Sequence, residues 1–182
     1  MKAIDLLVQR QSNAALAQPA PSEEHLDLIL KAAMRVPDHG ALTPWHFTIV
    51  KETGLEKLAS IYFNALEREN VEQVKLDKAK KMPFRAPMII TVSTEFVEHE
   101  KIPQQEQLIA AGCTVHAMQM AAFALGYGAI WRTGELSYNS EVKKSLNIDE
   151  KDEIVGFLYI GSKTKELPLK PNKSYKNKVT YL

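Results

Sequence analysis

Cationic side chains and hydroxyls that could hold a phosphate group recur where predicted helices and strands end. These positions are Arg10 with Ser12, Arg35, and Arg132 with Thr133. A guanidinium donates two parallel hydrogen bonds to a phosphate, and a nearby hydroxyl adds a third. An arginine near a helix C-terminus also stabilises the helix dipole, so each position alone is a weak indicator of a phosphate site.

The sequence offers little for metal binding or for catalysis by the protein's own side chains. The five histidines show no HExxH or HxxxH spacing and no accompanying carboxylate pair, which argues against a metal site. For His39, contact with a ligand and no contact are equally compatible with the sequence. For His116, on an apolar helix, a hydrogen-bonded position in the core or at an interface is favoured. The single cysteine, Cys113, favours a small buried side chain over a nucleophile and excludes an internal disulfide. No G-x-S-x-G elbow, G-x-G-x-x-G loop or Walker loop is present.

The elements that would position these residues are helices separated by short strands. Helical patterns are expected over 3–10, from 22 to before Pro37, over 53–68, 71–81 and 103–125, and briefly after 139. Strands are expected over 45–51, 88–93, 129–132 and 154–160. This order predicts the α+β class, with a small central sheet flanked by helices.

Capping residues predict where several elements begin and end. Ser22 and either Asn139 or Ser140 are typical N-caps, and Thr53 with Glu56 predicts a capping box. Gly126 is expected to end the long helix as a C-cap. Gly161 is expected to end the last strand.

Length and charge favour one globular domain over residues 1–182, with an extended polar arm from about residue 162. The 23 Lys and Arg residues balance 22 Asp and Glu, so no global field attracts nucleic acid or membrane. The lysines of the arm favour a solvated segment, or one that wraps a partner subunit. The absence of a signal-peptide pattern predicts a cytoplasmic protein.

Residues 107–131 carry no formal charge, a length that could span a bilayer. Polar side chains recur through this stretch, and glycines interrupt its end. We therefore expect a helix surrounded by protein instead of a membrane span. Because the core of one small chain rarely surrounds a helix completely, we infer a homodimer whose subunit interface covers the rest.

Several segments, taken in order, resemble the nitroreductase family of FMN-dependent oxidoreductases, in particular its short YdjA-like subgroup. They are Arg10-Gln11-Ser12, the loop from Arg35-Val36-Pro37 to Thr43-Pro44-Trp45, Phe84-Arg85-Ala86-Pro87, and AAFALGYGAIWRTG over 121–134. The likeness covers nearly the whole chain. The Pro44-Trp45 loop end and the GYGAIWRTG turn are its most specific parts.

The resemblance implies a nitroreductase-like sandwich that forms a homodimer with FMN at the subunit interface. Arg10, Gln11 and Ser12 would contact the FMN phosphate and ribityl chain. Arg35 and His39 would reach the flavin from the partner subunit. Trp131, Arg132 and Thr133 would line the ring and its tail.

The resemblance also implies a binding segment for the electron donor, NADH or NADPH. Its residues are Ala121, Ala122, Phe123, Ala124, Leu125 and Gly126. Their apolar side chains are equally typical of helix packing. In addition, Gln11 and Ala14-Ala15 occupy places where relatives usually carry arginine, which predicts weaker FMN binding unless another cation compensates.

By resemblance, the expected activity is reduction of nitroaromatic or quinone-type planar acceptors by ping-pong hydride transfer. It needs no catalytic acid, base or nucleophile from the protein. The same fold could carry another FMN-dependent reaction, such as dehydrogenation or dehalogenation. A flavin-binding or sequestering protein without turnover is a third alternative. A nucleic-acid-binding role for the lysine-rich arm is the least favoured.

Overall fold

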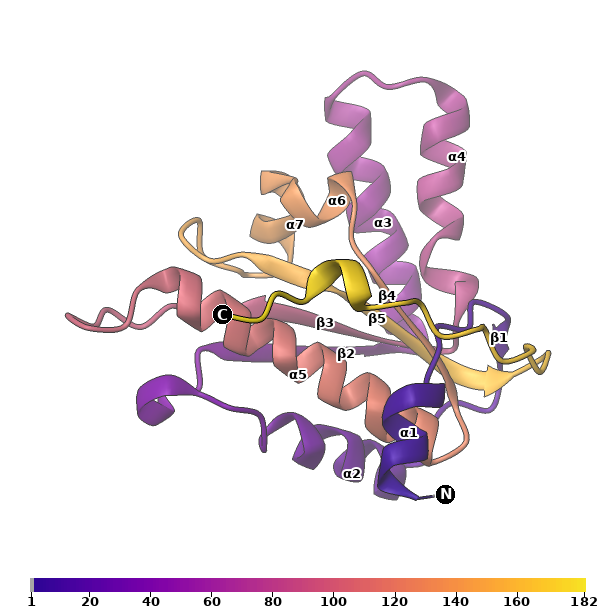
Figure 1. Cartoon of the computed structure of the whole chain (residues 1–182). Coiled ribbons are helices and arrows are strands. Elements are labelled where there is room, and N and C mark those ends of the chain that lie inside the picture. Colours follow the sequence, from indigo (N-terminus) through magenta and orange to yellow (C-terminus); the bar gives the residue numbers. More distant parts are fainter. Residues whose placement is uncertain (1) are drawn as a thin grey trace.

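The computed structural model describes residues 2–182 and shows a five-stranded antiparallel sheet between helices (Figure 1). The strands are β1 (Leu16–Ala17), β2 (Trp45–Lys51), β3 (Met88–Thr94), β4 (Gly128–Arg132) and β5 (Ile154–Lys163). Their order is β1-β5-β3-β2, and β4 also pairs with β5. The expected α+β class is confirmed.

Helices cover both faces of this sheet (Figure 1). One face carries α2 (Glu23–Ala33) and α5 (Gln104–Ala124), with α1 (Ala3–Gln9) beside α5. The other face carries α3 (Thr53–Arg68), α4 (Gln73–Lys81), α6 (Glu135–Tyr138) and α7 (Ser140–Ser145). Single 3₁₀ turns occur at His39–Ala41, Pro83–Arg85 and Lys176–Lys178.

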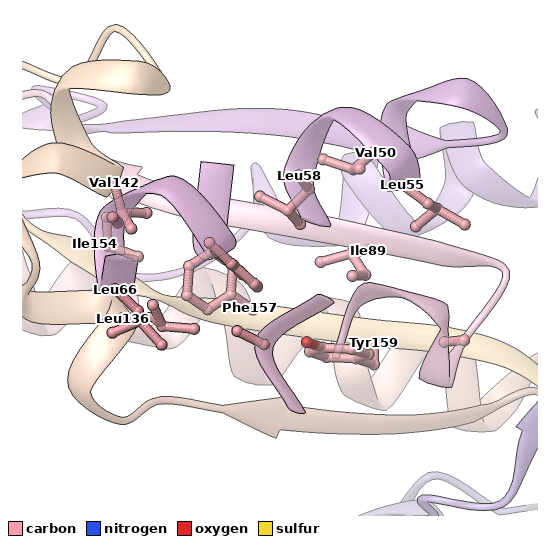
Figure 2. Close-up of a cluster of buried hydrophobic side chains, with 14 of the residues drawn as sticks. Val50, Leu55, Leu58, Leu66, Ile89, Leu136, Val142, Ile154, Phe157 and Tyr159 are labelled. Atoms are coloured by element: carbon pink, nitrogen blue, oxygen red, sulfur yellow. The ribbon is translucent and has the colours of Figure 1, made fainter. Parts of the chain in front are cut away.

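The central strand β3 is buried along its whole length because both of its faces pack against helices. Ile89 points into the cluster beneath α3 together with Leu58 and Phe157 (Figure 2). Ile90 and Val92 point into the opposite cluster, beneath α2 and α5. This alternation follows from the two-residue period of a strand, and it explains the continuous apolar run Met88-Ile89-Ile90.

Most of the expected caps are confirmed. The Ser22 hydroxyl accepts a hydrogen bond from the His25 N–H, and the Asn139 side chain accepts from two N–H groups at the start of α7. After α5, the Gly126 N–H donates to the Phe123 carbonyl and the Tyr127 N–H to the Ala122 carbonyl. This is a Schellman motif, with Gly126 at a φ of 90°.

Two expected boundaries are wrong. Thr53 is the first helical residue and not the cap of α3, because Glu52 in left-handed conformation, at a φ of 52°, makes the turn out of β2. Strand β5 also continues past Gly161 to Lys163. A side chain at Gly161 would lie 2.9 Å from the Ala17 carbonyl oxygen, so glycine permits the close approach of β1 instead of ending β5.

Strand β1 is a short addition that the sequence pattern does not predict. Leu16 and Ala17 pair with Lys163 and Ser162 at the end of β5. Gly128 makes room for this pairing, since a Cβ there would lie 2.6 Å from the Leu16 side chain. The chain after α1 is thereby fixed beside β4. Across residues 2–182, no helix is both long enough and apolar enough to cross a membrane.

Candidate functional site

The segment after α1 is held between α5 and β4. The Asn13 N–H donates to the Ala129 carbonyl at 3.0 Å, and the Asn13 side-chain amide donates to the Lys165 carbonyl at 3.0 Å. The Gln119 amide on α5 donates at 3.3 Å both to the Ser12 hydroxyl and to the Ala129 carbonyl. Ser12 is therefore tied to the edge of β4, although its own surface is exposed.

Arg10 is half-buried, and its Nη1 atom is enclosed without a hydrogen-bond partner. Beside it, the Gln11 amide donates to the Leu167 and Pro168 carbonyls at 3.2 and 3.0 Å, so the C-terminal arm passes over this position. The Gln11 Oε1 atom has no partner. A buried donor without an acceptor is costly, and an anionic ligand beside Arg10 would satisfy it.

The outer edge of β4 is open beyond Ala129. The Ala129 carbonyl points away from β5, because it accepts from Asn13 and Gln119. Backbone groups of an antiparallel strand reverse direction at each residue, so the Trp131 N–H and C=O point the same way as those of Ala129. This edge offers backbone donors and acceptors to a flat ligand next to Ser12.

The Trp131 side chain packs toward α5 in a space left by two glycines. A Cβ on Gly112 would lie 3.8 Å from the indole, and a Cβ on Gly156 would lie 2.2 Å from the indole nitrogen. That nitrogen donates to the Val155 carbonyl at 3.2 Å. Trp131 is 37% exposed, so part of its ring is available to a ligand or to another chain.

Arg132 points to the opposite face of the sheet and lines a cavity of about 360 Å³ between β4, β5, α6 and the end of α4. The guanidinium lies 5.6 Å from the centre of the Tyr159 ring. Burial raises the pKa of the Tyr159 hydroxyl, and the charges of Arg85 and Arg132 oppose that rise. Thr133 also lines this cavity.

Arg85 and Lys78 are cavity residues for which sequence reasoning assigned no role. Arg85 lies in the Phe84-Arg85-Ala86-Pro87 segment that carries part of the family resemblance. Its position before a buried strand is the signal that could have identified it. The side chain is directed to the cavity because the 3₁₀ turn Pro83–Arg85 joins α4 to β3 at the cavity wall.

The single chain does not bring Arg35 and His39 to the other site residues. His39 Nδ1 lies 2.7 Å from the Glu106 carboxylate at the start of α5, whereas Ser12 contacts Gln119 near its end. The rise of a helix separates Glu106 and Gln119 by about 20 Å. Arg35 is exposed after α2.

Residues 121–126 form the last turn of α5 and its cap. Ala122 is fully buried in the cluster beneath α2, and Ala121 and Leu125 pack against that cluster. Phe123 lines a groove of about 100 Å³ together with Gln11 and Gly128. The exposed members, Ala124 and Gly126, offer mainly backbone groups.

The structure bears on two expectations for α5. Cys113 is only partly buried, so it is not a fully enclosed core side chain. His116 is exposed, which rules out the core position and leaves the expected interface position as a prediction. Both residues lie on a helix whose apolar surface extends beyond the part that α2 and the sheet cover. Within residues 2–182, no group of three or more His, Cys, Asp or Glu side chains could hold a metal ion.

Comparison with known proteins identifies relatives over most of the chain. The sequence model of the nitroreductase family matches residues 7–162. YdjA of Escherichia coli (strain K12), named for an inferred NAD(P)H nitroreductase activity, is 44% identical over 162 residues, which cover 89% of this chain and 88% of YdjA.

Solved structures share the fold. A nitroreductase-like family protein from Bacillus cereus superposes with a TM-score of 0.87 at 22% identity, covering 100% of this chain and 96% of its own. A nitroreductase with bound FMN from Bacteroides fragilis superposes with a TM-score of 0.73 at 21% identity, covering 100% of this chain and 99% of its own.

Proposed function

The chain belongs to the nitroreductase family, and on that premise we propose that it is an FMN-dependent NAD(P)H oxidoreductase that reduces nitroaromatic or quinone-type acceptors. One observation carries the proposal. The enclosed Nη1 of Arg10 has no partner, and it belongs to the short segment that is tied through Ser12 to the open edge of β4. A guanidinium that can donate hydrogen bonds to a phosphate, next to a strand edge that can hydrogen-bond a flat ring, suits FMN.

The residues of this segment divide the binding of FMN between them. Arg10 and Ser12 hold the phosphate and the adjoining ribityl chain, and Gln11 anchors the C-terminal arm above them. The backbone of Trp131 and Thr133 provides hydrogen bonds for the edge of the ring. Arg132 adds positive charge at the end of β4.

Bound FMN supplies the hydride and electron transfer that joins the nucleotide donor to the acceptor. The chain itself orients the two reactants in turn against the edge of β4. Apolar neighbours such as Trp131 exclude water there. We place the NADH or NADPH contact at residues 121–126, where Phe123 borders the groove beside Gln11.

The site is completed by a second copy of the chain. His39 contacts Glu106, about 20 Å along α5 from the Gln119 that contacts Ser12, so we propose that Arg35 and His39 serve the flavin of a partner subunit. Exposed apolar side chains on α1 and α5 support such an interface; they are Ile4, Leu7, Val8, Leu108 and Ile109. We propose a homodimer of single-domain chains whose arms, beyond the contacts of Leu167 and Pro168 with Gln11 of the same chain, lie across the partner.

The proposal is tested by an anaerobic absorption spectrum of the protein reconstituted with FMN. Flavin bands should bleach when NADH or NADPH is added and should return when a nitroaromatic or a quinone follows. Titrating both nucleotides in parallel identifies the preferred donor. FMN-free protein serves as the control for direct reaction between nucleotide and acceptor.

The other outcomes separate the alternatives. Bands that persist with both nucleotides would leave a flavoprotein with another donor or a sequestering role. Bands that bleach with a nucleotide but return with none of the nitroaromatics or quinones would indicate a different FMN-dependent reaction. Failure of FMN to bind at all would refute the site.

A further inference from the structure

We propose that the cavity at the end of β4 is a binding site for an oxyanion, and that it selects planar acceptors that carry a carboxylate. The inference rests on the proposed function and names the substrate class for it. The cavity lies on the α3 and α4 face of the sheet, whereas Arg10 and Ser12 lie beside α5. The cavity is therefore built from residues other than Arg10 and Ser12, which we propose hold the FMN phosphate.

The charge lining this cavity is predominantly positive. Arg85, Arg132 and Lys78 all line it. Among residues 2–182, no carboxylate lies within ion-pair distance of these three side chains. The one acidic liner, Glu135, is already paired with Lys75 at 2.5 Å. Both guanidiniums act on the Tyr159 hydroxyl, so their charges converge on one region.

Buried donors without partners belong to residues that line the same cavity. Tyr62 and Ser137 line it, each is 1% exposed, and neither hydroxyl has a hydrogen-bond partner. The Nε of Arg132 is likewise enclosed and unpartnered. Burial raises the pKa of Tyr62 far above its ordinary value, so its hydroxyl keeps its proton and can donate.

These groups define the chemistry of the ligand. Guanidinium N–H groups only donate, and the two hydroxyls can donate, so the complementary group accepts several hydrogen bonds and carries negative charge. A carboxylate meets both requirements. The volume of about 360 Å³ admits a substituted benzene ring, and Thr133, which lines the cavity, directly follows β4, the strand at whose edge we propose that the acceptor is reduced.

The test compares 4-nitrobenzoate with 4-nitrobenzamide, a neutral acceptor of nearly the same size, on the FMN-loaded protein. We expect kcat/KM for the carboxylate to exceed that for the amide by about tenfold or more. Arg85→Gln should lower kcat/KM for 4-nitrobenzoate about tenfold and leave kcat/KM for 4-nitrobenzamide unchanged. Tyr62→Phe, which removes only the unpartnered hydroxyl, should reduce the carboxylate value by about threefold.

Binding of benzoate and benzamide, measured by calorimetry on the same protein, gives a readout that is independent of turnover. Arg85→Gln should weaken benzoate alone. Arg68→Gln is the matched control, because Arg68 is an exposed arginine of α3 that pairs with Glu141. Arg68→Gln should change the affinity for neither ligand.

Equal values for the two acceptors, or for benzoate and benzamide, would overturn the inference. So would an Arg85→Gln variant that loses FMN affinity by the same factor, because the cavity would then belong to the flavin. A protein that binds benzoate through Arg85 but reduces no acceptor would refute the proposed function and leave the oxyanion site standing.

Discussion

Replacing Arg10 with alanine separates a ligand-binding role from a structural one. The side chain makes no ion pair among residues 2–182, and its enclosed Nη1 has no hydrogen-bond partner. Its removal should therefore change the free energy of unfolding of the FMN-free protein by less than about 1 kcal/mol. The free energy of FMN binding should change by more than this.

The expected loss follows from one charge-assisted hydrogen bond between the guanidinium and the phosphate. Such a bond contributes about 1.5–3 kcal/mol, which corresponds to an increase in Kd of roughly 10- to 150-fold. Riboflavin lacks the phosphate, so its affinity should be the same for the wild-type protein and for Arg10→Ala. Quenching of flavin fluorescence measures both affinities, and urea unfolding of the FMN-free protein measures stability.

Three results would refute this reasoning. An unchanged Kd for FMN would show that Arg10 does not hold the phosphate. An equal loss for FMN and riboflavin would place Arg10 at the ring or at the ribityl chain. A loss of stability large enough to account for the weaker binding would make Arg10 a structural residue. Arg68→Ala, at an exposed ion pair, controls for the removal of positive charge.

Three further predictions concern stability and are checked by urea unfolding. Gly156→Ala should cost about 1–3 kcal/mol, because the new Cβ would lie 2.2 Å from the Trp131 indole nitrogen, and the tryptophan fluorescence should shift; an unchanged midpoint would contradict this packing. Asn139→Ala should cost about 1 kcal/mol through loss of the α7 N-cap, whereas Asn139→Asp should keep the cap; equal losses in the two variants would disprove a capping role. Burial raises the pKa of Tyr62, so above pH 10 the unfolded chain releases a proton that the folded chain retains, and stability falls as the pH rises. Between pH 9 and pH 11 the wild type should lose about 1.4 kcal/mol more than Tyr62→Phe, and parallel losses would exclude the tyrosine as the cause.

Sequence patterns predicted the elements whose local signals agree with their packing. The alternation of Trp45–Lys51 identifies β2 with its observed bounds, and the helix predicted over 103–125 agrees with α5 to within a residue at either end. Asn139 and Gly126 act as caps because their side chain or conformation meets a purely local requirement.

Long-range pairing produced the failures. Strand β1 has two residues in a segment that is typical of turns, and only its distant partner β5 makes it a strand. Gly161 is a strand terminator by local rules, but here it accommodates Ala17 and Pro87. Thr53 fits a capping box in sequence, yet the left-handed Glu52 already starts the helix.

The candidate site divides in the same way. The family resemblance pointed to Arg10, Ser12 and Arg132, which remain proposals as cofactor ligands. The positive cavity was not foreseen, because it joins Arg85 after α4 to Arg132 at the end of β4. Such a convergence depends on strand order, which no single segment encodes.

The fit of Trp131 against Gly156 constrains the order in which this part of the protein can evolve. A side chain at position 156 is accessible only after Trp131 has become smaller, because a Cβ there would occupy the space of the indole. Replacing Trp131 first meets no such barrier. A lineage that first loses the tryptophan can then acquire a residue at 156 that blocks its return, which makes this pair a one-way step in the diversification of the site.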